Sequence, residues 1–237
     1  MKTVFAVLAA AGLATAASAT TYTDSQNELF DNGFGHLDIA SVDVTHDANF
    51  ITFTINVRGS IDAGAGGSNW GKYCIGIDTG AVGGDTSNGW GRNVSWGAGQ
   101  GIEFYVGSWA DASFPFGGGA ELRQMSGLND NSNTLLDATY TTNTLIQAST
   151  AAFSQTVSVS RAAIGMGGDG TFRFDIFTTG GGGGDPGVDH LSRSDAATDG
   201  WGTQSVAGQF LSYTIPTPGA LALMGMGGLV AARRRRA

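Results

Sequence analysis

Hydrophobic and polar residues alternate in several short stretches along the middle of the chain. Residues 51–57 place Ile, Phe, Ile and Val at every second position, with Thr, Thr and Asn between them. Residues 102–107 and 172–177 show the same period of two. This alternation is typical of β-strands that bury one face. The pattern therefore predicts an all-β core.

Six further segments have the length and apolar content of strands: Leu37–Val44, Trp70–Asp78, Ala120–Met125, Thr144–Ala148, Phe153–Val159 and Gln209–Ile215. In the first of them the apolar phase slips by one position between Ile39 and Val42, which predicts a β-bulge. Helical spacing is confined to short turns at 161–164 and 186–192. We expect one antiparallel, jelly-roll-like β-sandwich of eight to eleven strands over residues 20–214.

The first 19 residues have the pattern of a secretory signal peptide. Lys2 is followed by an apolar run over residues 4–17, and the run ends in Ala17-Ser18-Ala19. Small residues at these last positions suit cleavage after Ala19. We therefore expect an exported protein.

The last 23 residues, 215–237, have three parts. Their apolar run, residues 220–232, predicts a helix that reaches about 20 Å, short of the roughly 30 Å hydrocarbon core of a bilayer. This length predicts transient membrane association, with the arginines on the cytoplasmic side. An ordinary C-terminal anchor is the alternative. The motif before the helix and the basic cluster after it are Pro216, Thr217, Pro218 and Gly219, and Arg233, Arg234, Arg235 and Arg236.

This order of proline motif, short apolar helix and terminal arginine cluster resembles the PEP-CTERM sorting signals of Gram-negative bacteria that make extracellular polysaccharide. Thr217 stands where the usual motif has Glu, and the Pro-Thr-Pro-Gly sequence resembles a planctomycete-type variant. The resemblance implies transient contact with an exosortase-type transpeptidase that cuts near residues 216–219. It places the body at the cell surface or in the extracellular matrix.

Charge and composition narrow the classes of partner. Only 14% of the residues are charged, and 39 of the 237 are Gly. The 20 acidic residues lie between Asp24 and Asp199, whereas five of the 12 basic residues lie at the two ends. Such an acidic body repels nucleic acid and anionic membranes. Cys74 is the single cysteine of the sequence, so the chain forms no internal disulfide.

Four of the five tryptophans fall between residues 70 and 109. Indole rings stack under sugar rings, and neighbouring polar side chains then bind the sugar hydroxyls. The alternative is that these rings fill the core. Our candidate carbohydrate-binding residues are the platforms Trp90, Trp96 and Trp109, with Arg92, Asn93, Glu103 and Asp111 as polar partners.

Two glycine-rich turns carry pairs of aspartates that suit calcium. Asp78 and Asp85 flank one turn, and Asp185 and Asp189 flank Pro-Gly-Val in the other. Carboxylates and free backbone carbonyls are the hard oxygen ligands that Ca²⁺ prefers. The alternative reading is solvated turn aspartates without an ion.

The stretches 73–80, 88–92, 101–109 and 174–180 together resemble strand edges of DOMON-like and family-nine carbohydrate-binding modules. The resemblance covers about residues 24–213. It implies a jelly-roll that binds sugar, or haem in some members, often with calcium.

The histidines lie in no sequence frame that pairs them with a nucleophile or a metal. We therefore expect a non-catalytic surface or matrix protein that binds extracellular polysaccharide. No cofactor is certain from the sequence, and calcium is the one candidate ion. The alternatives are a purely structural matrix protein and a glycan-active hydrolase or lyase.

Overall fold

The computed structural model describes residues 19–61, 70–80, 84–111 and 118–216. Within these ranges the protein is all-β, with two antiparallel sheets and one short 3₁₀ turn, η1 (Gly35–Leu37). The same ranges hold no helix long and apolar enough to cross a membrane. The predicted signal peptide and nearly all of the predicted sorting signal lie outside the described residues.

The first sheet has the strand order β1-β2-β3-β10-β9. Its strands are β1 (Thr20–Thr23), β2 (Ile39–His46), β3 (Phe50–Val57), β9 (Ile146–Ala151) and β10 (Ser154–Ser160). The register of β2 on β3 shifts between Ile39 and Ser41, which confirms the predicted bulge. Along β3 every second residue is buried, as the alternation predicted.

The second sheet has the order β12-β11-β4-β6-β7-β8, and β14 pairs with the first half of β11. Its strands are β4 (Lys72–Asp78), β6 (Phe104–Trp109), β7 (Gly119–Met125), β8 (Asn133–Ala138), β11 (Gly170–Thr179), β12 (Gly187–His190) and β14 (Leu211–Ile215). A short parallel pair, β5 (Val94–Ser95) with β13 (Ser205–Val206), lies outside both sheets. Residues 187–190, predicted as part of a helical turn, therefore form a strand, because they pair with the end of β11.

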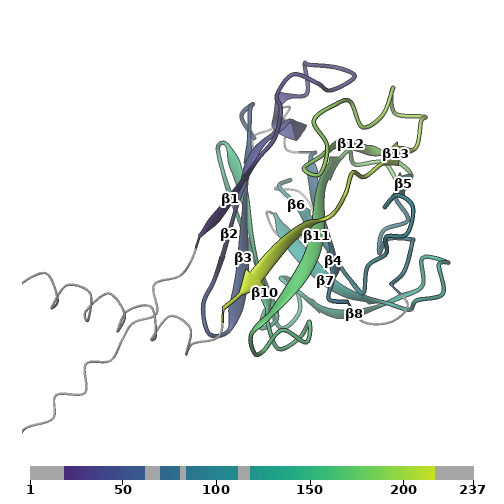
Figure 1. The fold of residues 1–237 in the computed structure, drawn as a ribbon. Coiled ribbons are helices and arrows are strands. Elements are labelled where there is room, and N and C mark those ends of the chain that lie inside the picture. The colour runs from purple at the N-terminus through teal and green to yellow at the C-terminus, as the bar shows by residue number, and fades with distance from the viewer. Residues whose placement is uncertain (1–18, 62–69, 81–83, 112–117, 217–237) are drawn as a thin grey trace, which may run out of the picture.

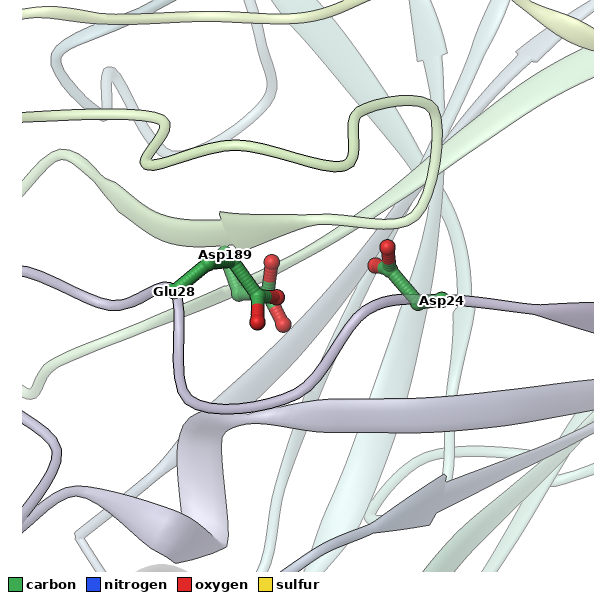
Figure 2. Close-up of side chains that lie close together, drawn as sticks. All are labelled: Asp24, Glu28 and Asp189. Atoms are coloured by element: carbon green, nitrogen blue, oxygen red, sulfur yellow. The ribbon is translucent and has the colours of Figure 1, made fainter.

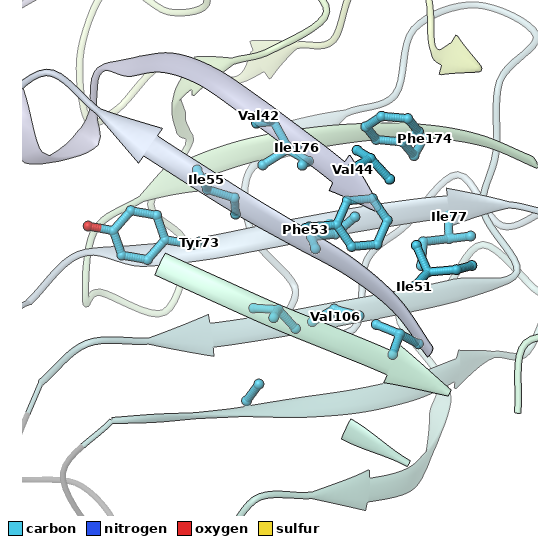
Figure 3. Close-up of a cluster of buried hydrophobic side chains, with 14 of the residues drawn as sticks. Val42, Val44, Ile51, Phe53, Ile55, Tyr73, Ile77, Val106, Phe174 and Ile176 are labelled. Atoms are coloured by element: carbon cyan, nitrogen blue, oxygen red, sulfur yellow. The ribbon is translucent and has the colours of Figure 1, made fainter. Parts of the chain in front are cut away.

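The main core lies between the two sheets. Figure 3 shows side chains of β2 and β3, such as Val44 and Phe53, facing Ile77, Val106 and Phe174 of the second sheet. All five side chains are buried. This face-to-face packing is the arrangement of a β-sandwich, so the coarse fold prediction is confirmed.

A second core covers the outer face of the second sheet. β6 is buried at all six positions, and β4 is buried at all but Lys72. Cys74, Tyr105 and Phe177 point outward and pack under the segment between β4 and β6, which contributes Trp96. The central strands are thus enclosed on both faces.

The two ends of the described fold lie together. β1 starts and β14 ends at the same end of the sandwich, whereas the loops after β1 and β12 lie at the opposite end (Figure 1). The Tyr22 hydroxyl on β1 donates a hydrogen bond to the Ser212 carbonyl on β14, with an O···O distance of 2.6 Å.

One buried carboxylate, Asp137, organises the turn between β8 and β9. Burial alone raises a carboxyl pKa, but the Thr142 hydroxyl, the Leu145 amide and further donors outweigh it and hold the pKa of Asp137 well below its usual range. The donors to its two oxygens are the backbone N–H groups of Ala138, Asn143, Thr144 and Leu145 and the hydroxyls of Thr141 and Thr142.

We expect Asp137→Asn to lower the free energy of unfolding by about 2–4 kcal/mol at neutral pH, because an amide group cannot accept all these bonds. A lowered carboxyl pKa stabilises the fold fully above about pH 4, and this contribution declines as the pH falls further. Urea unfolding at neutral and acidic pH measures both effects, and the difference between variant and wild type should shrink in acid. Asp130→Asn, at an exposed turn, is the matched control.

Candidate functional site

The predicted tryptophan platform is not formed. Trp96 is 1% exposed and Trp109 is 5% exposed, so neither ring presents a face to a ligand. Trp96 packs against Phe177 and Phe210 in the second core and donates from Nε1 to the Ser87 carbonyl at 2.9 Å. The prediction is wrong for these two rings, because the outer face of the sheet needs large side chains to cover it.

Trp90 is half-buried and lies flat against the second sheet. Its ring occupies the space above Gly107, where any Cβ would collide with it. The indole Nε1 donates to Glu121 Oε2 at 3.0 Å, and the guanidinium carbon of Arg92 lies 5.5 Å from the ring centroid. Contacts within the protein therefore occupy much of this ring.

The predicted polar partners do not gather around one ring. Arg92 is buried and donates to the Gly182 carbonyl, and the Asn93 amide donates to the Asp185 carbonyl. Asp111 forms an ion pair with Lys72, with an N···O distance of 2.5 Å. Most of these groups join loops to one another.

Glu103, the remaining predicted partner, lines a polar cleft of about 390 Å³. Burial raises the pKa of Glu103, against the hydrogen bond that its carboxylate accepts from the Thr79 amide. The cleft offers hydrogen bonds and charge, but its lining contains no aromatic ring. It is lined by Asp78, Gly80, Gly84, Thr86, Gly99, Gln100, Gly101, Glu103 and Arg173.

The four predicted calcium ligands have other partners in the structure. Asp78 forms an ion pair with Arg173, and Asp85 accepts hydrogen bonds from the Ser87 and Gly127 amides. Asp185 accepts from the Gly182 amide. Asp189, on β12, instead joins two carboxylates from the loop after β1.

Asp24, Glu28 and Asp189 form an acidic group (Figure 2). One carboxylate oxygen of each lies within 4.8 Å of the others. Burial raises the pKa of Asp24 to about 8. The hydrogen bond from the Ser25 amide lowers this pKa, and the charge of Glu28 raises it further. Burial likewise raises the pKa of Glu28 and, far more, that of Asp189. Sequence reasoning found Asp189 but missed the other two, because their proximity depends on the path of the loop.

An aromatic edge, defined here as Phe30, Phe34, Trp70 and Trp201, lies at the same end of the fold. The ring centroids of Trp201 lie 5.4 Å from those of Phe30 and Phe34 and 6.0 Å from that of Trp70. Trp201 is 36% exposed and is supported by the three other rings. It is the one tryptophan outside the cluster between residues 70 and 109.

The aromatic edge is continuous with the acidic group. Leu29, which follows Glu28, packs with Val188, which precedes Asp189, and Phe30, Phe34 and Trp70 pack against this pair. Beneath Trp70, the His36 ring lies 4.5 Å away centroid to centroid, and burial lowers the pKa of His36 to about 4. The loop between β1 and β2 therefore contributes residues to both features.

The glycine loop 180–184 lies beside Trp201. A Cβ at Gly180 would lie 2.9 Å from the Trp201 ring and would also strike the Asp185 carboxylate. Glycine at this position lets the backbone, with its N–H and C=O groups, approach the ring closely. An exposed indole beside polar backbone and a carboxylate has the elements of a sugar-binding surface.

Asp175, His190 and Ser205 have the residue types and order of contacts of a hydrolase triad. His190 Nδ1 lies 2.6 Å from Asp175 Oδ2, and His190 Nε2 lies 3.0 Å from Ser205 Oγ. All three residues are fully buried. The Gly187 backbone covers the His–Ser pair, and its N–H donates to Ser205 Oγ at 2.9 Å. In this arrangement no reacting carbonyl can approach the serine. The hydrogen bonds among the three residues instead link β11, β12 and β13.

The chain matches no protein-family model, and no curated protein matches it. The resemblances to PEP-CTERM signals and to carbohydrate-binding modules remain predictions from the sequence.

We expect a fluorophosphonate probe to leave Ser205 unlabelled in the folded protein, because the hydroxyl is enclosed. Intact-protein mass spectrometry measures the labelling, with Ser205→Ala as the control. Ser205→Ala should instead lower the free energy of unfolding by about 1–3 kcal/mol, because it leaves buried partners unsatisfied. Labelling that disappears in Ser205→Ala and His190→Gln would mean that the triad is reached by substrate.

Proposed function

We propose that the protein is an exported, non-catalytic surface or matrix protein whose jelly-roll-like sandwich binds carbohydrate at the aromatic edge. The observation that carries this proposal is the 36% exposed Trp201, held by Phe30, Phe34 and Trp70. A ring supported on its inner side keeps its orientation without a ligand, so stacking a sugar on it costs little conformational entropy.

The surroundings of Trp201 support a sugar rather than a purely apolar ligand. The glycine loop 180–184 supplies backbone hydrogen-bonding groups, and four of its five residues are exposed. The partly exposed Asp185 adds a carboxylate that accepts hydrogen bonds from hydroxyl groups. The acidic body disfavours polyanionic ligands, so a neutral or basic polysaccharide fits best.

Export and sorting rest on the two ends of the sequence. In this proposal the signal peptide directs the chain out of the cytoplasm, and residues 220–232 hold it briefly at the inner membrane. An exosortase-type transpeptidase then cuts near residues 216–219. The described fold is compatible with both cuts, because β1 starts at Thr20 and β14 ends at Ile215.

We expect Trp201→Ala to weaken binding to the host's extracellular polysaccharide by about tenfold or more, the effect of losing roughly 1.4 kcal/mol of stacking. Polysaccharide pull-down and calorimetric titration measure the affinity. Trp201 also packs on three rings, so the thermal midpoint should fall, and the affinity is measured well below that midpoint.

Trp90→Ala is the control for the Trp201 variant, because it removes an indole whose ring is largely occupied by contacts within the protein. Loss of binding in Trp90→Ala with normal binding in Trp201→Ala would move the site away from the aromatic edge. No polysaccharide binding by the folded wild-type protein would favour the purely structural alternative. Release of soluble sugar products would favour the enzyme alternative.

We expect the mature protein, isolated from its native host, to begin at Thr20 and to end between residues 216 and 219. Peptide mapping by mass spectrometry of both ends measures this. Replacing Arg233, Arg234, Arg235 and Arg236 by Ala should leave the uncut chain in the membrane fraction. An intact C-terminus on the wild-type surface protein would favour the ordinary anchor instead.

A further inference from the structure

The acidic group brings its oxygens to a spacing that suits a cation. Asp24 and Glu28 come from the loop after β1, and Asp189 comes from β12, so two separate segments meet there (Figure 2). Oxygens bound to calcium at 2.3–2.6 Å lie at most about 5 Å from one another. The limit of 4.8 Å among these three oxygens agrees with one ion between them.

Several of these oxygens are enclosed and have no hydrogen-bond partner. Both carboxylate oxygens of Glu28 and Oδ2 of Asp24 are inaccessible to water and unpaired. An enclosed carboxylate oxygen without a donor is strongly unfavourable, and such charges are normally paired or bound to metal. Proton uptake is the other way to relieve them, because a protonated carboxyl donates a hydrogen bond to a neighbouring carboxylate, and titration with calcium separates the two cases.

Asp38 gives a further observation from the same loop, at the residue before β2. Asp38 is fully buried, and its Oδ1 has no partner. Its Oδ2 is held by the Arg58 Nε and the Asn27 amide, at 2.6 and 3.0 Å. The charge of Asp38 raises the pKa of Asp24, Glu28 and Asp189, so its carboxylate adds to the negative charge around the acidic group.

The positive charge near these carboxylates does not balance them. In the ranges that the structure describes, Arg58 is the one cationic side chain that forms an ion pair with any of the four acids, and it binds Asp38. Asp189 is held instead by backbone amides, since its two oxygens accept from Ile39 and His190. Four carboxylates thus share one guanidinium.

We propose that Asp24, Glu28 and Asp189, with Asp38 beside them, bind a calcium ion that fixes the loop between β1 and β2 onto β12. The donors are oxygens only, which favours a hard cation over zinc or copper. Calcium tolerates irregular sets of six to eight oxygens, whereas magnesium needs near-octahedral geometry at 2.0–2.1 Å. This site shares Asp189 with one of the two pairs that the sequence indicated, and it takes none of Asp78, Asp85 and Asp185.

The loop that the ion would hold also carries Phe30 and Phe34 of the aromatic edge. Calcium would therefore fix Phe30 and Phe34, which support Trp201. The ion itself would not contact a sugar bound to the Trp201 ring. The cation site does not depend on carbohydrate binding, and its test uses the metal alone.

The experiment titrates CaCl₂ into the full chain after treatment with EDTA and desalting. We expect calorimetric binding of about one ion, and a rise of about 5–10 °C in the thermal midpoint at calcium 100-fold above the dissociation constant. MgCl₂ at the same concentration should give a clearly smaller rise. Absence of both binding heat and a thermal shift at millimolar calcium would overturn the proposal.

The stability difference between Glu28→Gln and wild type should change sign when calcium is added. A merely structural role of Glu28 does not produce such a change. In EDTA the variant should be as stable as wild type or more so, because it removes an unpaired charge. In calcium it should be less stable than wild type, with an affinity lowered about tenfold or more. Asp24→Asn should behave in the same way, and exposed Asp130→Asn should keep the wild-type calcium shift.

Two results with these variants would overturn the assignment. A full calcium shift in both Glu28→Gln and Asp24→Asn would place the ion elsewhere. An equal loss of stability with and without calcium would mean that the carboxylates act without a cation. If neither variant folds, the calorimetric titration of the wild type decides the question alone.

Discussion

The structure depends on the burial of one sheet on both of its faces. The central strands β4 and β6 pack against the first sheet on one side and under the segment between them on the other. Gly76 makes this covering possible, because a Cβ there would lie 2.7 Å from the Trp96 ring. Most large aromatic side chains of this region are therefore used to close the protein, and the exposed indole, Trp201, lies on a loop at one end.

The fold was predictable where one face of a strand meets water. The alternation in residues 51–57 predicted β3, and the phase slip near Ile39 predicted the bulge, since both depend on neighbouring residues only. β4 was found as an apolar run, but its burial on two faces leaves no alternation to read. β1 and β8 were missed because their short sequences, rich in threonine, asparagine and aspartate, carry little apolar alternation, and they form strands by pairing with β2 and β7.

The candidate site was less predictable, because it depends on long-range packing. Trp90, Trp96 and Trp109 are close in sequence, yet the fold buries Trp96 and Trp109. The exposed ring is that of Trp201, which lies outside this sequence cluster and was therefore not a candidate. The acidic group combines Asp189 with two residues from more than 150 positions earlier. The Asp175–His190–Ser205 contacts likewise have no local motif, since β11, β12 and β13 bring them together.

The placement of the chain ends gives the molecule a direction. β1 begins and β14 finishes at one pole of the sandwich, and the loop that bears Phe30 and Phe34 lies at the other (Figure 1). Any tether joined to either end therefore holds the rings of the opposite pole outward, at the full length of the strands from the supporting surface. An array of such molecules on a cell would present its indoles to the surroundings without a hinge or a change of shape.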